Sequence, residues 1–353
     1  MYLTIKQLRL QAITSAFFTP TTLRRAIERF GFVQADPIRS PARAQDLILR
    51  HRVKNYKAGD LEKQYPKIRL EEDFLYAYGF MPQSTWQLLH PRTTTRLSIT
   101  DKRILEIVSN HKKIHPAELE AYLGRKRTVN AWGGYSKMTT KNLQNLQYRG
   151  FLRIAGRQDG IRLYEAVSTV PEWMDPAERL EKLVLLIAAI LAPVPEASLR
   201  ATLRHLAYAS PSLAGRKSIV GTLLTSGALT SGVADGIKYL WPSGKLARKK
   251  TADLVRFLAP FDPLVWDRRR FEHLWGWPYR FEAYTPPAKR KLGYYSMPLL
   301  WRDDIIGWVN ISNNRGDLII KPGYMKDVPA DPSFASAFEM ETEKFRHFME
   351  SSE

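Results

Sequence analysis

The 353-residue sequence predicts an α+β protein in which tandem winged-helix domains, a variant of the helix-turn-helix, precede a C-terminal antiparallel β-domain. Three observations support this prediction. Residues 101–168 show three helical patterns followed by a β-hairpin. A similar series of patterns recurs 76–77 residues later. Beyond residue 242 the chain changes to strand-like runs that are rich in proline and aromatic residues.

Residues 101–170 are predicted to form the clearer of the two winged-helix domains. Apolar residues recur at helical spacing from residue 104, a second helix follows Pro116, and a third covers about 137–149. Two short runs of alternating apolar and polar residues then flank Asp159-Gly160, a dipeptide that favours tight hairpin turns. Three helices and a hairpin are the elements of a winged helix.

Residues 171–241 repeat this arrangement. Gly227 lies 77 residues after Gly150, and Asp235-Gly236 lies 76 residues after Asp159-Gly160. Two independent landmarks at nearly one offset indicate a duplicated unit. The helices expected in the second copy cover about 177–191, a segment after Pro195, and about 212–226.

The two ends of the chain differ from this repeat. Residues 1–100 are predicted to form a helical, winged-helix-like domain, with helices over about 4–17 and 21–30. Residues 242–330 are predicted to form the β-domain, for which a barrel is one possible form, and residues 331–353 a closing acidic helix. The expected strands are Tyr279–Tyr284, Gly293–Leu300, Ile305–Ile311 and Asp317–Ile320.

The net charge of +19 predicts a polyanionic partner, most simply nucleic acid, although a basic soluble protein without such a partner is the alternative. The charge is unevenly distributed. Residues 169–241 have a net charge of +1, whereas residues 1–100, 101–168 and 242–330 have +8, +7 and +7. We therefore interpret the second winged helix as a packing module and expect its neighbours to contact the polyanion.

Several classes of protein are disfavoured by composition. The absence of cysteine excludes disulfides, thiol chemistry and cysteine-ligated metals, and it suits a reducing cytoplasm. Only His111 and His115 have a helical ligand spacing, and no third ligand accompanies them, so no metal or other cofactor is predicted. The longest apolar run, Leu183–Ala192, is about half a membrane span, and the N-terminus lacks signal-peptide features.

Gln34 and Asp36 are the best candidates for catalysis. They follow directly on the end of a predicted helix, and in extended backbone their side chains would share one face about 6.5 Å apart. That spacing suits one nucleotide, to which the pair offers a carboxylate and an amide. The alternative is structural, because aspartate before proline is a common turn former.

Basic residues near these elements are candidates for DNA contacts. Arg153, Arg157 and Arg162 lie on the predicted wing, and Lys137 and Lys141 lie on the third helix before it. A solvated helix face is the alternative for any one of them. The other candidates are Arg39 and Arg43 near the catalytic pair, and Lys289, Arg290 and Lys291 in a basic turn expected to join two strands. A solvated turn that protects the sheet edge is the alternative for these last three residues.

These segments together resemble the YcaQ/AlkZ-type DNA glycosylases, a family of tandem winged helices with a C-terminal β-domain. The resemblance extends over most of the chain. The segments that carry it are residues 32–36 (FVQAD), 42–49 (ARAQDLIL), 131–134 (AWGG), 260–270 (PFDPLVWDRRR) and 289–295 (KRKLGYY).

The resemblance implies that Gln34 and Asp36 form the catalytic motif, in the Gln-apolar-Asp form of the YcaQ-like branch. It implies a DNA repair enzyme that removes alkylated purines from double-stranded DNA and, for this branch, unhooks interstrand crosslinks. An N7-alkylated purine already leaves easily as a cation, so the enzyme must chiefly stabilise the sugar cation and position water. We expect Asp36 to supply the charge and Gln34 the positioning. No lysine is singled out as a nucleophile, so a monofunctional enzyme is expected.

A non-enzymatic winged-helix transcriptional regulator is the rival hypothesis. Such a protein would bind an operator sequence, usually as a symmetric dimer. The sequence shows no obvious dimerisation segment, and tandem units in one chain already provide an extended surface. We therefore expect a monomer in the cytoplasm, associated with the nucleoid.

Overall fold

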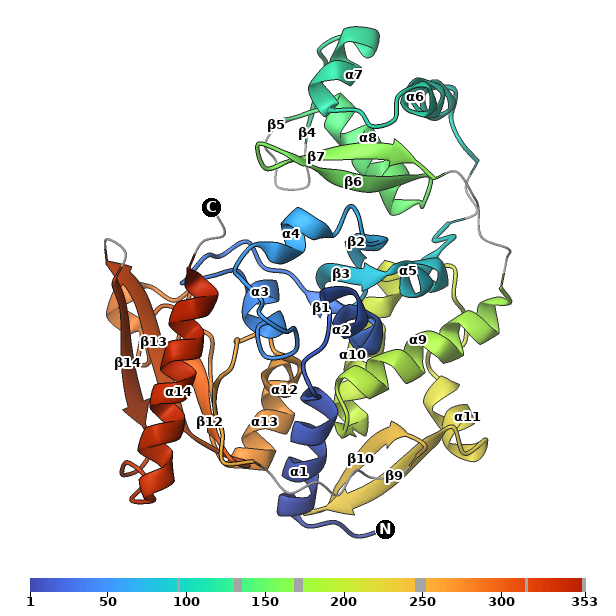
Figure 1. Cartoon of the computed structure of the whole chain (residues 1–353). Helices are drawn as coiled ribbons and strands as arrows, with labels where there is room; N and C mark the ends of the chain where they lie inside the picture. The colour runs from blue at the N-terminus through green and yellow to red at the C-terminus, as the bar shows by residue number, and fades with distance from the viewer. Residues whose placement is uncertain (94–95, 130–134, 168–173, 245–251, 315–316, 351–353) are drawn as a thin grey trace.

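Figure 1 shows a computed structural model of the chain, which describes all residues except 94–95, 130–134, 168–173, 245–251, 315–316 and 351–353. Elements of the first ninety residues lie at the centre, between the first winged helix, the second winged helix and the C-terminal sheet (Figure 1). These central elements are α1 (Ile5–Ala16), α2 (Leu23–Phe30), β1 (Val33–Gln34), α3 (Ala44–Leu49), α4 (Asp60–Gln64), β2 (Leu70–Phe74), β3 (Tyr78–Pro82) and α5 (Gln83–Leu89).

The turn from α2 into β1 sets the position of the predicted catalytic segment. Thr22 caps α2, since its side chain accepts a hydrogen bond from the backbone N–H of Arg25, and Gly31 ends the helix at a φ of 72°. β1 then pairs with β3 in an antiparallel sheet of order β1-β3-β2. Gly79 of β3 permits this pairing, because a Cβ there would lie 2.2 Å from the backbone oxygen of Val33.

The first winged helix contains the predicted three helices and hairpin. Asp159 and Gly160 at the hairpin turn have φ angles of 49° and 79°, as the Asp-Gly pair predicts. The elements are α6 (Ile99–Asn110), α7 (Pro116–Leu123), β4 (Arg127–Val129), β5 (Tyr135–Lys137), α8 (Met138–Tyr148), β6 (Leu152–Gln158) and β7 (Ile161–Ala166). The small β4-β5 pair was not predicted.

The second winged helix has a similar succession of helices and a hairpin, as the tandem arrangement predicts. Asp235 and Gly236 have φ angles of 49° and 77°, nearly those of the first hairpin. The elements are α9 (Pro176–Ile190), β8 (Val194–Pro195), α10 (Glu196–Ala209), α11 (Ile219–Thr225), β9 (Leu229–Ala234) and β10 (Ile237–Pro242). The third helix begins seven residues later than the predicted 212, because the chain first turns through the Pro211–Ser218 stretch.

The C-terminal region is built around an antiparallel sheet of order β11-β12-β13-β14, an open half-barrel with β11 and β14 at its edges. Helix α14 runs beside this sheet and contacts β11 (Figure 1). The elements are β11 (Val255–Phe257), α12 (Pro263–Trp266), α13 (Arg268–Trp275), a short 3₁₀ helix (Pro287–Lys289), β12 (Met297–Trp301), β13 (Asp304–Asn314), β14 (Asp317–Tyr324) and α14 (Pro332–Met349).

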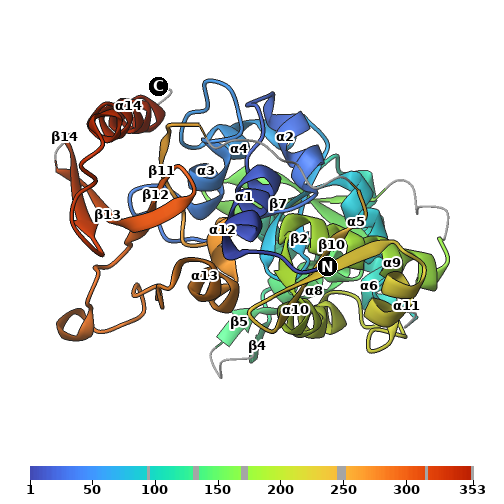
Figure 2. The same cartoon turned by 90° about the horizontal axis from the view of Figure 1, so that it is seen from below.

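Two predictions for the C-terminal region were wrong. Tyr279–Tyr284 is not a strand, and Lys289–Lys291 do not join two strands. The chain between α13 and β12 instead forms a long excursion from the body of the protein (Figure 2). Glu282 replaces strand pairing there, because its carboxylate accepts hydrogen bonds from the backbone N–H groups of Lys291, Leu292 and Gly293 at 2.8–3.2 Å.

The core places β1 at the junction of the surrounding units. Val33 belongs to a buried cluster that includes Leu143 of the first winged helix and Leu299 of the C-terminal sheet. Its neighbour Phe32 belongs to another cluster, with Leu183 of the second winged helix. Because successive side chains point to opposite faces of a strand, this short segment is packed from both sides.

Candidate active site

Gln34 and Asp36 lie at the end of extended backbone that is held by β3. Gln34 is paired with Gly79, and the backbone N–H of Ala35 donates to the carbonyl of Tyr78 at 2.9 Å. The chain leaves the sheet at Asp36, whose own N–H donates to Oε1 of Gln45 at 3.3 Å. The predicted extended conformation is therefore present up to Ala35.

Asp36 also forms the turn that its neighbour Pro37 suggested. Its Oδ1 accepts a hydrogen bond from the backbone N–H of Ile38 at 2.9 Å. Its Oδ2 accepts none from the described part of the chain. The structural and the catalytic interpretations are thus compatible, since one oxygen fixes the carboxylate and the other is left for a ligand.

The electrostatic setting of Asp36 is unusual for so basic a protein. Burial raises the pKa of its carboxyl group, and the hydrogen bond from Ile38 offsets this rise only in part. No arginine or lysine of the described chain forms an ion pair with it. Asp36 is consequently a half-buried carboxylate without a cationic partner.

Gln34 contributes a second group with spare hydrogen-bonding capacity. Its side-chain Oε1 is buried and has no hydrogen-bond partner within the described residues. A buried amide oxygen without a partner is costly, and such groups are commonly satisfied by water or a ligand. Gln34 does not line the cavity that contains Asp36.

That cavity, of about 320 Å³, brings Asp36 together with three predicted DNA-binding residues, Arg43, Arg157 and Arg162. The arginines already have partners. Arg43 pairs with Glu62, and Arg157 pairs with Glu72. Arg162 donates to the hydroxyl of Tyr78 at 2.7 Å, and its Nε lies 3.6 Å from Oε1 of Glu72. The remaining lining residues are Ala35, Pro37, Gln45 and Phe80.

Two tyrosines of the excursion between α13 and β12 lie near Asp36, and sequence reasoning did not single them out. Burial and then the negative charge of Asp36 raise the pKa of both Tyr284 and Tyr295. Tyr284 is 77% exposed, whereas Tyr295 is buried and its hydroxyl has no partner in the described chain. The one sequence feature that could have indicated them is that they flank the basic segment Lys289–Lys291.

The basic excursion is fixed in shape close to these tyrosines. Lys289 and Lys291 are exposed, and Arg290 donates to the carbonyl of Thr285 at 2.8 Å while it lies 4.9 Å from the ring of Tyr294. Tyr284 and Tyr295, which flank the Lys289–Lys291 segment, thus lie near Asp36, although about 250 residues separate them from it in sequence.

The wing arginines Arg153, Arg157 and Arg162 pair with side chains of the N-terminal unit, although Arg157 is also exposed to solvent. Arg153 bridges Glu71 and Glu165 at 3.0 and 2.5 Å, so its guanidinium group is already bound by two carboxylates. This differs from the phosphate contact predicted for Arg153. The sequence did not indicate that Glu71 and its neighbours in β2 are buried. Acidic side chains are rarely buried without ion-pair partners, and those partners lie far away in the sequence.

The other predicted contacts remain on the surface. Arg39, Lys137 and Lys141 are exposed. Lys137 pairs with Glu120 at 2.9 Å, whereas Arg39 and Lys141 have no ion pair within the described residues. These three positions stay predictions for DNA contact.

A metal site is not evident in the part of the chain that the structure describes, where no group of three or more potential ligands occurs. His111 donates from Nδ1 to the carbonyl of Ile107 at 2.7 Å, and Nδ1 of His115 accepts from the N–H of Ala117 at 3.1 Å. Both histidines thus serve helix ends. Among the described helices, none is long and apolar enough to cross a membrane.

Comparison with known proteins gives two findings. The model of a family described as DNA glycosylase AlkZ-like matches residues 27–348. The fold is similar to that of the Streptomyces sahachiroi DNA glycosylase AlkZ, with a TM-score of 0.64 and 14% sequence identity. This similarity covers 99% of the present chain and 97% of the Streptomyces chain.

Proposed function

The chain belongs to the AlkZ-like DNA glycosylase family, and we propose that it hydrolyses the N-glycosidic bond of N7-alkylated purines in duplex DNA, with Asp36 and Gln34 as its catalytic residues. The observation that carries the proposal is the half-buried carboxylate of Asp36, which has one oxygen fixed by Ile38 and one without a partner in the described chain. Such a group is held in place but is not neutralised.

Asp36 stabilises the sugar as positive charge develops on it. Cleavage of an N-glycosidic bond gives an oxocarbenium-like transition state, and a fixed anion beside it lowers the barrier. The arginines of the cavity would cancel this effect if they paired with Asp36. Glu62 and Glu72 bind Arg43 and Arg157 instead, which leaves the charge of Asp36 available.

Gln34 lies two residues from Asp36 but outside the lining of its cavity, and we propose that it positions the attacking water or the sugar from there. Its buried Oε1 lacks a partner in the described residues, so it can accept a hydrogen bond from a water molecule without breaking an existing one. In this division of labour Asp36 supplies charge and Gln34 supplies orientation.

We propose a monofunctional enzyme that leaves an abasic site in an uncut strand. A bifunctional glycosylase needs an amine nucleophile beside the sugar. The described residues that line the Asp36 cavity include three arginines and no lysine, and guanidinium groups stay protonated. Borohydride trapping should therefore yield no covalent adduct with damaged DNA.

DNA is proposed to lie across the basic surface beside Asp36. Arg39, Lys141, Lys289 and Lys291 are proposed to contact phosphates, because they are exposed. Lys137 and Arg290 are proposed to contact phosphates as well, although each already has a partner within the protein. Arg43, Arg157 and Arg162 would act at the cavity itself. Monomeric action, unhooking of interstrand crosslinks and residence with the nucleoid in the cytoplasm belong to this proposal.

The direct test is release of the base. Purified protein is incubated with a duplex that contains one N7-methylguanine, with a duplex that carries an interstrand crosslink, and with an undamaged duplex. Released base and abasic sites are then measured. We expect release from the damaged duplexes only. Tight binding to a particular undamaged sequence without any base release would favour the transcriptional regulator.

A further inference from the structure

Three arginines, Arg50, Arg52 and Arg256, lie near only two carboxylates, Asp262 and Glu341. Arg52 is fully buried and binds Asp262 through two hydrogen bonds of 2.7 and 3.1 Å. Arg50 pairs with the buried Glu341. Both carboxylates of this cluster are therefore already bound to a guanidinium group.

Arg256 is the third arginine, and it lacks such a partner. Its guanidinium group stacks on the ring of Phe17 at 4.5 Å from the ring centre, and Arg52 lies at the same distance from that ring. Within the described chain, Arg256 has neither a side-chain hydrogen bond nor an ion pair. Partly buried cations are normally paired, because loss of hydration is costly without compensation.

The surroundings increase this imbalance. Burial lowers the pKa of Arg256, and the charges of Arg52 and Arg50 lower it further, against the opposing effect of Glu341 and Asp262. Burial and the same three arginines hold the pKa of His51 well below its usual range. The cluster therefore has one more guanidinium group than it has carboxylates to pair with.

A cavity of about 870 Å³ opens beside Arg256. Lys54 and Lys344 also line it and are exposed, without an ion pair in the part of the chain that is described. The acidic residues of its wall are committed elsewhere, as Glu341 binds Arg50, Glu343 binds Arg346, and Glu350 binds Lys57.

We propose that this cavity binds a phosphate group, held by the guanidinium group of Arg256 and the ammonium groups of Lys54 and Lys344. Arginine presents several N–H donors in a plane that matches a tetrahedral oxyanion, and a charged acceptor gives the stronger class of hydrogen bond. The phosphate would balance the positive charge that remains after two carboxylates have paired with two of the three arginines.

The site is separate from the proposed catalytic one. Its lining shares no residue with the cavity of Asp36, which lies at the opposite end of α3. The inference therefore does not depend on the role of Asp36. The phosphate group can belong either to the backbone of bound DNA or to a free phosphate or nucleotide, and the experiment distinguishes these sources.

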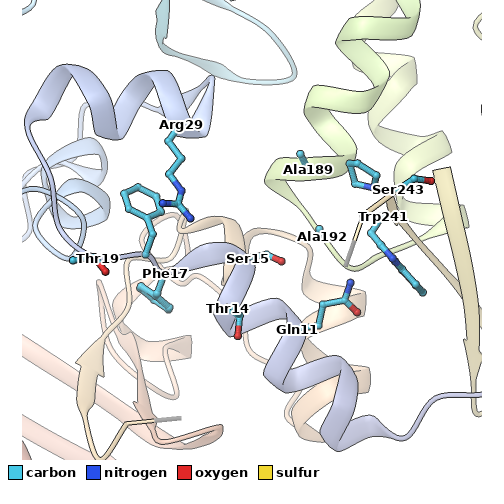
Figure 3. A pocket seen from close by; sticks show the side chains of 13 residues that line it. Gln11, Thr14, Ser15, Phe17, Thr19, Arg29, Ala189, Ala192, Trp241 and Ser243 are labelled. Carbon is cyan, nitrogen blue, oxygen red and sulfur yellow. The ribbon is translucent and has the colours of Figure 1, made fainter. Parts of the chain in front are cut away.

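Arg29 provides a control, and Figure 3 shows it among the residues that line its own pocket. Its guanidinium group stacks on the next phenylalanine, Phe18, at 4.3 Å, but it lines a different cavity of about 440 Å³ with Gln11, Ser15 and Trp241. That cavity has no comparable set of arginines among its described residues. Arg29→Met and Arg256→Met thus remove the same chemical group from two guanidinium–phenylalanine stacks, of which the one at Arg29 is exposed and the one at Arg256 is half-buried.

The first arm measures the melting temperature while inorganic phosphate replaces chloride at constant ionic strength. We expect phosphate to raise the melting temperature of the wild type and of Arg29→Met. For Arg256→Met the apparent phosphate affinity should fall at least about tenfold, as expected for loss of a charge-assisted hydrogen bond. Lys54→Met, a change at an exposed position, should weaken it in the same direction.

The second arm measures binding of an undamaged duplex as a function of salt. If the site holds a backbone phosphate, Arg256→Met should reduce the slope of log K against log salt by about one unit relative to Arg29→Met. If the site holds a free phosphate group, Arg256→Met should leave the salt dependence of DNA binding unchanged, but it should weaken the stabilisation by inorganic phosphate in the first arm. Equal behaviour of Arg256→Met and Arg29→Met in both arms would overturn the proposal.

Discussion

At the scale of single residues, Asp36 combines a structural role with the catalytic role that we propose for it. Its Oδ1 closes the turn into Ile38, and its Oδ2 is free within the described chain. The sequence could indicate the pair Gln34 and Asp36 through spacing and family resemblance. It could not indicate that Glu62 and Glu72 occupy the neighbouring arginines, because those pairs join segments far apart in the chain.

The pH dependence of base release follows from the state of Asp36. Burial raises its pKa, so the carboxylate that we assign to catalysis is lost at a higher pH than for an ordinary aspartate. Single-turnover rates should fall about tenfold per pH unit once the pH is below this raised pKa. DNA binding is measured at each pH as the control. A rate that increases towards acid pH would mean that Asp36 acts in its protonated form.

At the scale of elements, the hairpin β6-β7 is attached to β2 by charge. Arg153 contacts Glu71 and Glu165, and Arg157 contacts Glu72, whereas the buried Asp73 of the same strand binds Arg92 at 2.9 Å. These pairs orient the first winged helix on the N-terminal unit. They also explain how three consecutive acidic residues are accommodated in a buried strand.

Arg153→Met should therefore act on stability more than on DNA binding. We expect a loss of about 1–3 kcal/mol in the free energy of unfolding, because Glu71 is left buried without its partner. Adding Glu71→Gln should recover part of this loss, which urea unfolding of the four proteins in the double-mutant cycle would measure. Unchanged stability together with weaker DNA binding would instead restore Arg153 as a phosphate contact.

The two hairpin turns allow a second test at this scale. Gly160 and Gly236 have φ angles of 79° and 77°, and an added Cβ would meet no atom within 4 Å at either position. Alanine there should cost about 1 kcal/mol through backbone strain alone.

Gly221 in α11 is the control for these glycines. Its surroundings are equally open but its φ is not positive, so Gly221→Ala should stabilise the protein by about 0.5–1 kcal/mol. Thermal unfolding of the three variants measures the expected loss of stability at Gly160 and Gly236 and the expected gain at Gly221. If Gly160→Ala or Gly236→Ala were neutral, the common turn geometry of the two units would be wrong.

Elements with local signals were the most predictable part of the fold. Caps and turn residues indicated α2 and both hairpins, since these depend on neighbours in sequence. The excursion between α13 and β12 was predicted as strands because its alternation resembles one. Its actual conformation depends on Glu282, which binds the backbone N–H groups of Lys291, Leu292 and Gly293 across the excursion.

At the scale of the whole molecule, the proposed DNA contacts are distributed over units that are distant in sequence. Arg39, Lys141 and Lys289–Lys291 come from three different units. The net charge of +19 predicted a polyanionic partner. It could not predict that the excursion with Tyr284 and Tyr295 lies beside Asp36, because that proximity depends on how the C-terminal unit packs on the centre.

DNA affinity should depend steeply on salt, and the basic excursion should account for part of that dependence. Replacing both Lys289 and Lys291 by glutamine should reduce the slope of log K against log salt by about two units. Lys182→Gln is a control, since Lys182 is exposed on the nearly neutral second winged helix and pairs with Glu178 at 2.8 Å. Equal slopes for the two variants would exclude the excursion from the DNA interface.

The central claim is that Asp36 carries the chemistry as a fixed anion. The most direct measurement compares the wild type with Asp36→Asn, which retains an oxygen able to accept the hydrogen bond from Ile38 but removes the charge. We expect the single-turnover release of N7-methylguanine to fall by about 10²–10⁴-fold, with DNA affinity nearly unchanged. Release at the wild-type rate by Asp36→Asn would contradict the assignment of Asp36 as the catalytic anion.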